Sequence, residues 1–175
     1  MALDLAIKNQ LQEYMTRLVN PIKLVASIDE NPASIEMIEM LEEVASLSGK
    51  ISLSKEANSL KRIPSFEVNR EEEDTGITFA GIPSGHEFTS FVLALLQTSG
   101  YPLKIDAEKI EQIKNIEGKF HFETYISLSC HNCPDVVQAL NVMSIINPNI
   151  SHVMIDGALF QKEVEDKQIM AVPTI

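Results

Sequence analysis

The stretch KFHFETYISLSCHNCPDVVQALNVM (residues 119–143) holds both cysteines of the chain, Cys130 and Cys133, in the spacing Cys-x-x-Cys. The apolar and β-branched run before the cysteines predicts a strand that is long enough to be central in a sheet. The segment after them predicts a helix whose apolar face is formed by Val136, Val137, Leu140 and Met143. This order places the cysteine pair between the end of a strand and the start of a helix.

That position gives the two sulfurs different chemistry. Cys130 would lie at the helix N-terminus, where unpaired N–H groups and the helix dipole favour a thiolate, the attacking species in disulfide exchange. Cys133 lies one turn further along the same side, and Pro134 falls in the first turn, where its missing N–H costs little. The spacing therefore supports an exchange reaction in which Cys130 attacks and Cys133 resolves the mixed disulfide.

Two other interpretations of the cysteine pair remain open from the residues alone. A zinc site needs two further ligands, but the four histidines form no H-x-x-x-H-like set, and His131 lies awkwardly between the cysteines; the histidines are His86, His121, His131 and His152. Inert structural thiols are the third interpretation, although two buried structural cysteines rarely fall at this spacing before a helix.

Composition narrows the class of protein. The chain has 175 residues, of which 45% are hydrophobic, and 25 acidic residues outweigh 14 Lys plus Arg to give a net charge of −11. Such a surface repels phosphates, so nucleic acids and anionic membranes are disfavoured as partners. The start, MALDLAIKNQ, lacks a signal-peptide pattern, and no run approaches the roughly 20 apolar residues of a membrane span. We expect a cytoplasmic protein, where Cys-x-x-Cys is more often catalytic or metal-binding than a permanent crosslink.

The first half predicts an alternation of helices and strands that ends at Gly100-Tyr101-Pro102. We expect helices at 5–18, 31–50 and 84–100, and strands at 22–28, 50–54, 65–69 and 77–81, the last two as a hairpin. In the helix expected at 31–50, the apolar periodicity predicts that four residues face the core: Ile35, Ile38, Leu41 and Ala45.

The second half repeats this order. We expect helices at 106–118, 133–143 and 158–168, and strands at 119–129, 150–156 and from 170 onward. Laid over each other, the halves place Asn31-Pro32 opposite Cys133-Pro134 and Pro64 opposite Pro173, with only a small insertion between them. Internal duplication is the economical explanation, and only the second copy has kept its cysteines.

The motifs carry a family resemblance. A strand, Cys-x-x-Cys, a helix and then Val-Pro-Thr (172–174) before a strand resembles the thioredoxin family. More narrowly, SLSCHNCPDVVQALNVM (127–143), IDGALFQKEVEDKQIMAVPT (155–174) and AGIPSGHEFTSFVLALLQ (80–97) look like the N-terminal domain of the F subunit of alkyl hydroperoxide reductase. This implies an α/β fold class, with two fused thioredoxin-like folds built on a mixed sheet flanked by helices. Residues 1–102 would form a degenerate copy without cysteines, and 103–175 a redox-active copy that is incomplete at its C-terminus.

The resemblance also implies roles for three residues besides the cysteines. Pro173 would be a cis-proline that packs beside the disulfide, and Glu87 an acid/base or pKa-tuning group near the redox pair. The residues alone give Glu87 a second, compatible role, since Ser84-x-x-Glu87 is a capping box. His131 is either a stabiliser of the thiolate or an exposed loop residue.

The function implied is electron transfer from a flavoprotein disulfide centre to a peroxiredoxin, the C subunit of alkyl hydroperoxide reductase. The seven glycines contain no G-x-G-x-x-G, so we expect no cofactor in this chain, and FAD and NAD(P)H in further domains of the same polypeptide. We therefore expect the sequence to be a fragment. Two rivals remain: a free-standing protein disulfide oxidoreductase, and an interaction module whose cysteines bind metal.

Overall fold

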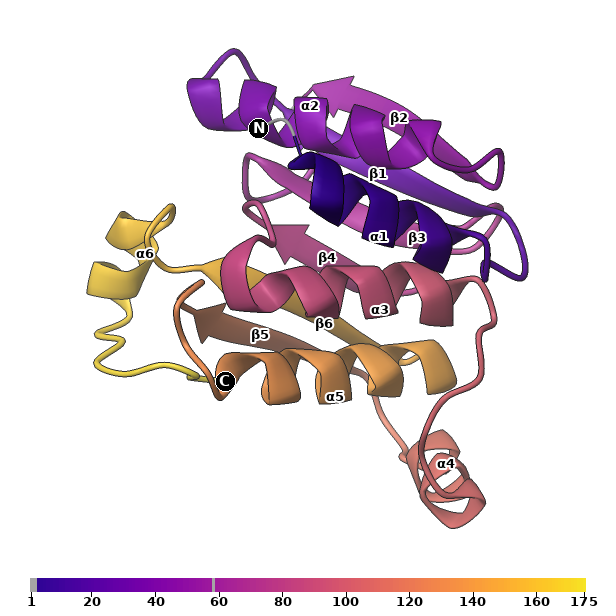
Figure 1. Ribbon diagram of the computed structural model, residues 1–175. Helices are drawn as coiled ribbons and strands as arrows, with labels where there is room; N and C mark the ends of the chain where they lie inside the picture. The colour runs from indigo at the N-terminus through magenta and orange to yellow at the C-terminus, as the bar shows by residue number, and fades with distance from the viewer. Residues whose placement is uncertain (1–2, 58) are drawn as a thin grey trace.

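The computed structural model describes residues 3–57 and 59–175, and its strands form one mixed sheet (Figure 1). Along the sheet the order is β2-β1-β3-β4-β6-β5. The strands are Ile22–Ile28 (β1), Ile51–Ala57 (β2), Ser65–Arg70 (β3), Ile77–Ala80 (β4), Phe120–Ile126 (β5) and Ile150–Asp156 (β6). Pairing is antiparallel for β1–β3 and β3–β4 and parallel for β1–β2, β4–β6 and β5–β6. The pairing of β4 with β6 makes the sheet continuous between the two halves.

The long helices gather on one face of this sheet. Figure 1 shows α1, α2, α3 and α5 side by side in front of the strands, with α6 at the end of the sheet where β5 and β6 finish. The helices are Leu5–Met15 (α1), Pro32–Ser46 (α2), Phe88–Thr98 (α3), Ala107–Lys114 (α4), Cys133–Ile146 (α5) and Gln161–Asp166 (α6), with a short 3-10 helix, η1, at Gly85–Glu87.

Alternation along the strands explains the layers. In β3, Phe66 and Val68 point to the helix face and are fully buried, because successive side chains of a strand point to opposite faces. Phe66, Phe79 and Phe91 form an aromatic cluster at the centre of the core, with ring centroids 5.3–5.9 Å apart. The opposite face carries a smaller cluster around Tyr125, on which α6 and its flanks pack; its members are Ala80, Tyr125, Val153, Ile155, Phe160, Val164 and Ile169.

The duplication expected from sequence is visible in the topology. The units β1–α2–β2 and β5–α5–β6 each pair their two strands in parallel. The peptide bonds before Pro64 and Pro173 are both cis. After each proline the chain pairs antiparallel with the first strand of its own unit, Ser65 with Ser27 and Thr174 with Tyr125.

Four expectations about elements are wrong in detail. The strand before the cysteines, expected to be central in the sheet, is β5, which stands at one end of the strand order. Ile35 is 54% exposed, and α2 instead buries Ser34, Met37, Met40, Leu41 and Val44. Apolar residues surround much of this helix, so periodicity alone leaves its rotation open, and the long, flexible methionines fill the core. The predicted helix 84–100 is divided into η1 and α3. The segment from 170 makes a single β-bridge with β5 rather than a strand.

Candidate redox site

The two cysteines lie where β5 ends and α5 begins. Cys130 and Cys133 form a disulfide, with their Cα atoms 5.6 Å apart. Cys133 is the first residue of α5 and is fully buried, whereas Cys130 is partly exposed. The backbone N–H of Cys133, a donor of the helix N-terminus, donates to the Cys130 sulfur at 3.2 Å. Of the two sulfurs, Cys130 is therefore the one that a partner can reach and that the helix N-terminus stabilises as a thiolate.

The segment that carries Pro173 lies directly beside Cys130. The carbonyl oxygen of Val172, across the cis bond to Pro173, is 4.0 Å from the Cys130 sulfur. Thr174 is tied to Tyr125 of β5 by two backbone hydrogen bonds, of 2.8 and 3.2 Å. The structure thus brings Pro173 to the disulfide from a position more than forty residues further along the chain.

Glu87 is fully buried in η1, and the predicted capping box is wrong. The Ser84 side chain makes no capping hydrogen bond, and among residues 3–57 and 59–175 neither carboxylate oxygen of Glu87 has a hydrogen-bond partner of acceptable geometry. The helix start is a 3-10 turn, closed by the Glu87 backbone N–H donating to the Ser84 carbonyl at 3.1 Å. Burial raises the pKa of Glu87, and the nearby Ser90 hydroxyl opposes this only in part. A buried carboxyl with a raised pKa is a candidate for proton exchange.

Close backbone contact holds η1 against the loop that leads to Cys130. The backbone N–H of His86 donates to the Leu128 carbonyl at 3.0 Å. Gly85 has φ +56°, and a Cβ at this position would lie only 2.7 Å from the Leu128 carbonyl oxygen. The conformation and the close approach together require glycine at position 85. The loop that leads to Cys130 therefore packs against the first half of the chain.

Two imidazoles meet beside this contact. The rings of His86 and His131 have centroids 4.4 Å apart and planes inclined at 61°, and both residues are exposed. The sequence indicates only a surface or packing role for His86, and no spacing signal links it to His131. Because His131 directly follows Cys130, this contact places both imidazole rings close to the disulfide along the chain.

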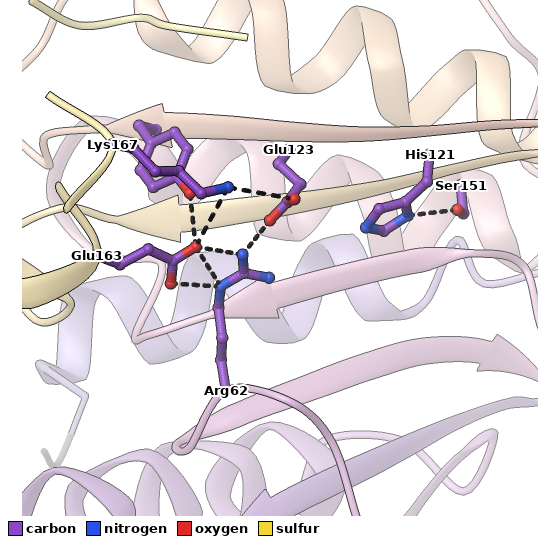
Figure 2. A network of polar contacts seen from close by, with 7 residues as sticks. Arg62, His121, Glu123, Ser151, Glu163 and Lys167 are labelled. Carbon is purple, nitrogen blue, oxygen red and sulfur yellow. Dashed lines mark hydrogen bonds and ion pairs between the residues drawn. The ribbon is translucent and has the colours of Figure 1, made fainter. Parts of the chain in front are cut away.

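The other two histidines lie in strands β5 and β6, where their rings make hydrogen bonds. His152 is fully buried in β6, with Nε2 2.7 Å from the Thr124 hydroxyl and Nδ1 2.8 Å from the Asn141 side-chain oxygen. Burial, helped by the charge of His121, lowers the pKa of His152 to about 3, so this ring is neutral at pH 7. His121 is exposed, with Nδ1 2.6 Å from the Ser151 hydroxyl (Figure 2).

A polar network that the sequence does not indicate joins the two halves (Figure 2). Arg62, whose side chain is only 7% exposed, donates from Nε to both Glu163 oxygens at 2.9 and 3.2 Å and from Nη2 to Glu123. The Arg62 guanidinium lowers the pKa of Glu163 to about 2, with a further contribution from the Tyr125 hydroxyl. Burial would raise the pKa of Glu123, but Arg62 outweighs it and the pKa is lowered. Lys167 completes the network, 3.6 Å from Glu123 and 3.9 Å from Glu163.

In the first half, a carboxylate occupies the place that corresponds to the redox pair. Asp29 precedes α2, accepts from the Ser34 hydroxyl at 2.6 Å and from the Asn31 backbone N–H at 3.0 Å, and both bonds lower its pKa. These bonds order the loop before α2, while the side chain of its N-cap residue, Asn31, makes no capping hydrogen bond. No three His, Cys, Asp or Glu side chains within the described part of the chain are arranged to hold a metal ion. Every helix among those residues falls short of the length and hydrophobicity that a membrane crossing requires.

The sequence is similar to those of longer known proteins. No protein-family model matches the chain. It is 60% identical over 175 residues to a protein of Bacillus subtilis (strain 168) called NADH dehydrogenase, a match that covers 100% of this chain and 34% of that protein. It is 57% identical over 173 residues to the F subunit of alkyl hydroperoxide reductase from Pseudomonas putida, covering 99% of this chain and 33% of that one. The chain thus spans about a third of the length of these relatives.

The fold and the site define a thioredoxin-like disulfide oxidoreductase with two fused copies of the fold. Among solved structures, the NTD_N/C domain of alkylhydroperoxide reductase AhpF from Enterococcus faecalis (V583) matches with a TM-score of 0.90 and 31% identity, over 98% of this chain and 88% of that one. The chain belongs to this family, the N-terminal domains of the F subunit of alkyl hydroperoxide reductase. A protein disulfide oxidoreductase from Aeropyrum pernix K1 shares the fold at 19% identity, with a TM-score of 0.85 over 99% of this chain and 83% of that one.

Proposed function

We propose that Cys130 and Cys133 carry electrons from a flavoprotein disulfide centre of the same polypeptide to a peroxiredoxin, the C subunit of alkyl hydroperoxide reductase. The single observation that supports this is the difference between the two sulfurs: Cys130 is accessible and accepts a helix N-terminal hydrogen bond, while Cys133 is buried behind it. Two relatives of three times the length have names that indicate a pyridine-nucleotide or hydroperoxide substrate. FAD and NAD(P)H are accordingly assigned to the part of the full-length polypeptide outside this chain.

The exchange proceeds in two balanced steps. The Cys130 thiolate attacks one sulfur of the partner disulfide, forming a mixed disulfide and releasing the partner's other sulfur as a thiolate. The Cys133 thiolate then attacks the Cys130 sulfur, which re-forms the Cys130–Cys133 disulfide and releases the second partner thiolate. Two electrons pass to the partner, which takes up two protons to become a dithiol. The flavoprotein dithiol reduces Cys130–Cys133 by the same steps in reverse.

The supporting residues receive roles consistent with their positions. Glu87, buried with a raised pKa, exchanges the proton that Cys133 loses and regains. His131, in contact with His86, stabilises the Cys130 thiolate. Val172 and Pro173 present backbone to an incoming chain, because the Val172 carbonyl lies 4.0 Å from the Cys130 sulfur. Residues 1–102 act as a scaffold without redox chemistry, residues 103–175 as the redox copy, and we place the protein in the cytoplasm.

Trapping tests this assignment. Cys133→Ser, mixed with the oxidised peroxiredoxin, should accumulate a mixed disulfide on a non-reducing gel, because no resolving thiol remains. Cys130→Ser is the matched control and should trap nothing. Trapping by the control alone would reverse the roles of the two cysteines, and trapping by neither would refute the peroxiredoxin as partner.

A further inference from the structure

We propose that Arg62, which comes from the half of the chain without cysteines, is a positioning residue for the redox site. It fixes α6 against the sheet and thereby holds the segment 167–175 beside Cys130. The inference rests on the proposed function only for the identity of the protein partner.

Arg62 is connected to α6 through Glu163. The guanidinium donates to Glu163 of α6 through Nε, and Nη2 contacts both Glu163 and Glu123 of β5 (Figure 2). Glu123 and Glu163 are 24% and 21% exposed, so this pair of carboxylates is largely removed from water. A planar guanidinium bonded to two carboxylates fixes direction as well as distance. Without it, the charges left to oppose the two carboxylates among the described residues are Lys167, which is 44% exposed, and Lys61, which acts on Glu123.

Tyr125 connects α6 to the segment beside the disulfide. Its hydroxyl donates to Glu163 at 2.5 Å, while its backbone forms both hydrogen bonds of the bridge to Thr174. Thr174 is two residues from Val172, whose carbonyl lies 4.0 Å from the Cys130 sulfur. The same residue thus holds α6 with its side chain and the wall of the redox site with its backbone.

Within residues 3–57 and 59–175, the segment 167–175 makes few other contacts. Met170 is 93% exposed and Val172 is 39% exposed. Ile169 reaches back to α6, where its N–H donates to the Val164 carbonyl at 3.0 Å and its side chain packs on the cluster around Tyr125. The segment is therefore anchored by α6 at one end and by the Tyr125–Thr174 bridge at the other. The Arg62 network contacts both anchors, because Glu163 lies in α6 and accepts from the Tyr125 hydroxyl.

The first half shows the simpler, uncharged version of this anchor. There Ser27, which corresponds to Tyr125 in strand position, accepts from the Leu60 N–H at 3.0 Å and pairs with Ser65. In that copy the strand side chain holds its own proline loop directly. The redox copy uses a longer side chain, a helix and an arginine contributed by the other copy, so the two halves are coupled at the site.

The test compares Arg62→Met, which keeps the aliphatic length and removes the charge, with Arg62→Lys. Arg70→Met is the control, because that side chain is 39% exposed and its ion pair is with Glu73, three residues on. Each reduced protein reacts with two probes: the small disulfide 5,5′-dithiobis(2-nitrobenzoate), and a disulfide-linked dimer of a short extended peptide. Amide hydrogen exchange of residues 167–175 is measured on the oxidised proteins.

We expect Arg62→Met to speed amide exchange in 167–175 and to slow the reaction with the peptide disulfide by about tenfold or more, while the small disulfide reacts within about twofold of the original rate. Arg62→Lys should restore the rate in part, and Arg70→Met should change nothing. Equal slowing with both probes, or unchanged exchange in 167–175, would overturn the proposal. If Arg62→Met does not fold, Glu163→Gln carries the same expectation. Neither probe is a peroxiredoxin, so failure of the proposed partner would be recognised separately.

Discussion

Replacing Gly85 by alanine tests the close contact between η1 and the redox loop. At φ +56° a residue with a Cβ loses roughly 1–2 kcal/mol relative to glycine. The added Cβ would also lie 2.7 Å from the Leu128 carbonyl oxygen, and the neighbour is backbone, which cannot rotate away. Overpacking of this kind costs typically about 1–3 kcal/mol. We therefore expect Gly85→Ala to lower the free energy of unfolding by roughly 2–5 kcal/mol.

Urea unfolding followed by circular dichroism measures this loss, provided that the slope with urea concentration is unchanged. Gly49→Ala is the matched control, because a Cβ there has no atom within 4 Å and its φ is outside the left-handed region. It should stay within about 0.5 kcal/mol of the original protein. Equal unfolding midpoints for the two variants would show that Gly85 does not lie in close contact with the Leu128 carbonyl.

Three further changes have outcomes fixed by burial. The folded-state pKa of Glu87 lies above its unfolded value, so the charge of Glu87 destabilises the fold as pH rises. Glu87→Gln should therefore be more stable than the original protein at pH 8 and equal to it at pH 4. The same gain at both pH values in urea unfolding would contradict this. The folded-state pKa of His152, about 3, lies below the unfolded value of 6.5, so stability should fall between pH 6.5 and 3 by up to about 1.4 kcal/mol per unit. His152→Gln should remove that slope, and thermal unfolding at pH 7 and pH 5 compares the two proteins. Phe91→Ala should cost about 3–5 kcal/mol in urea unfolding, whereas Phe120→Ala, at a position 43% exposed, should cost much less.

The sequence by itself determined the helices and strands that depend on residues close to one another in the chain. The strand, Cys-x-x-Cys and helix of 119–143 follow from side-chain periodicity, and the asymmetry of the two sulfurs follows from their places at a helix start. The β3–β4 hairpin was likewise predictable, since alternating apolar residues flank a charged turn. The duplication and the pairing of Pro64 with Pro173 needed only a comparison of the chain with itself.

The tertiary structure alone decided which residues gather around that motif. Ser84-x-x-Glu87 fits a capping box locally, but the helix starts with a 3-10 turn at Gly85 that lies against Leu128, and among the described residues the buried Glu87 carboxyl has no hydrogen-bond partner. Likewise, α2 turns Met37 inward and Ile35 outward because the shape of the core, not hydrophobicity, sets its rotation. Arg62 and Glu163 are 101 residues apart, and each alone is typical of an ordinary surface charge. Periodicity reports on the few residues within one turn or one strand, whereas these contacts arise only when elements far apart in the sequence pack together.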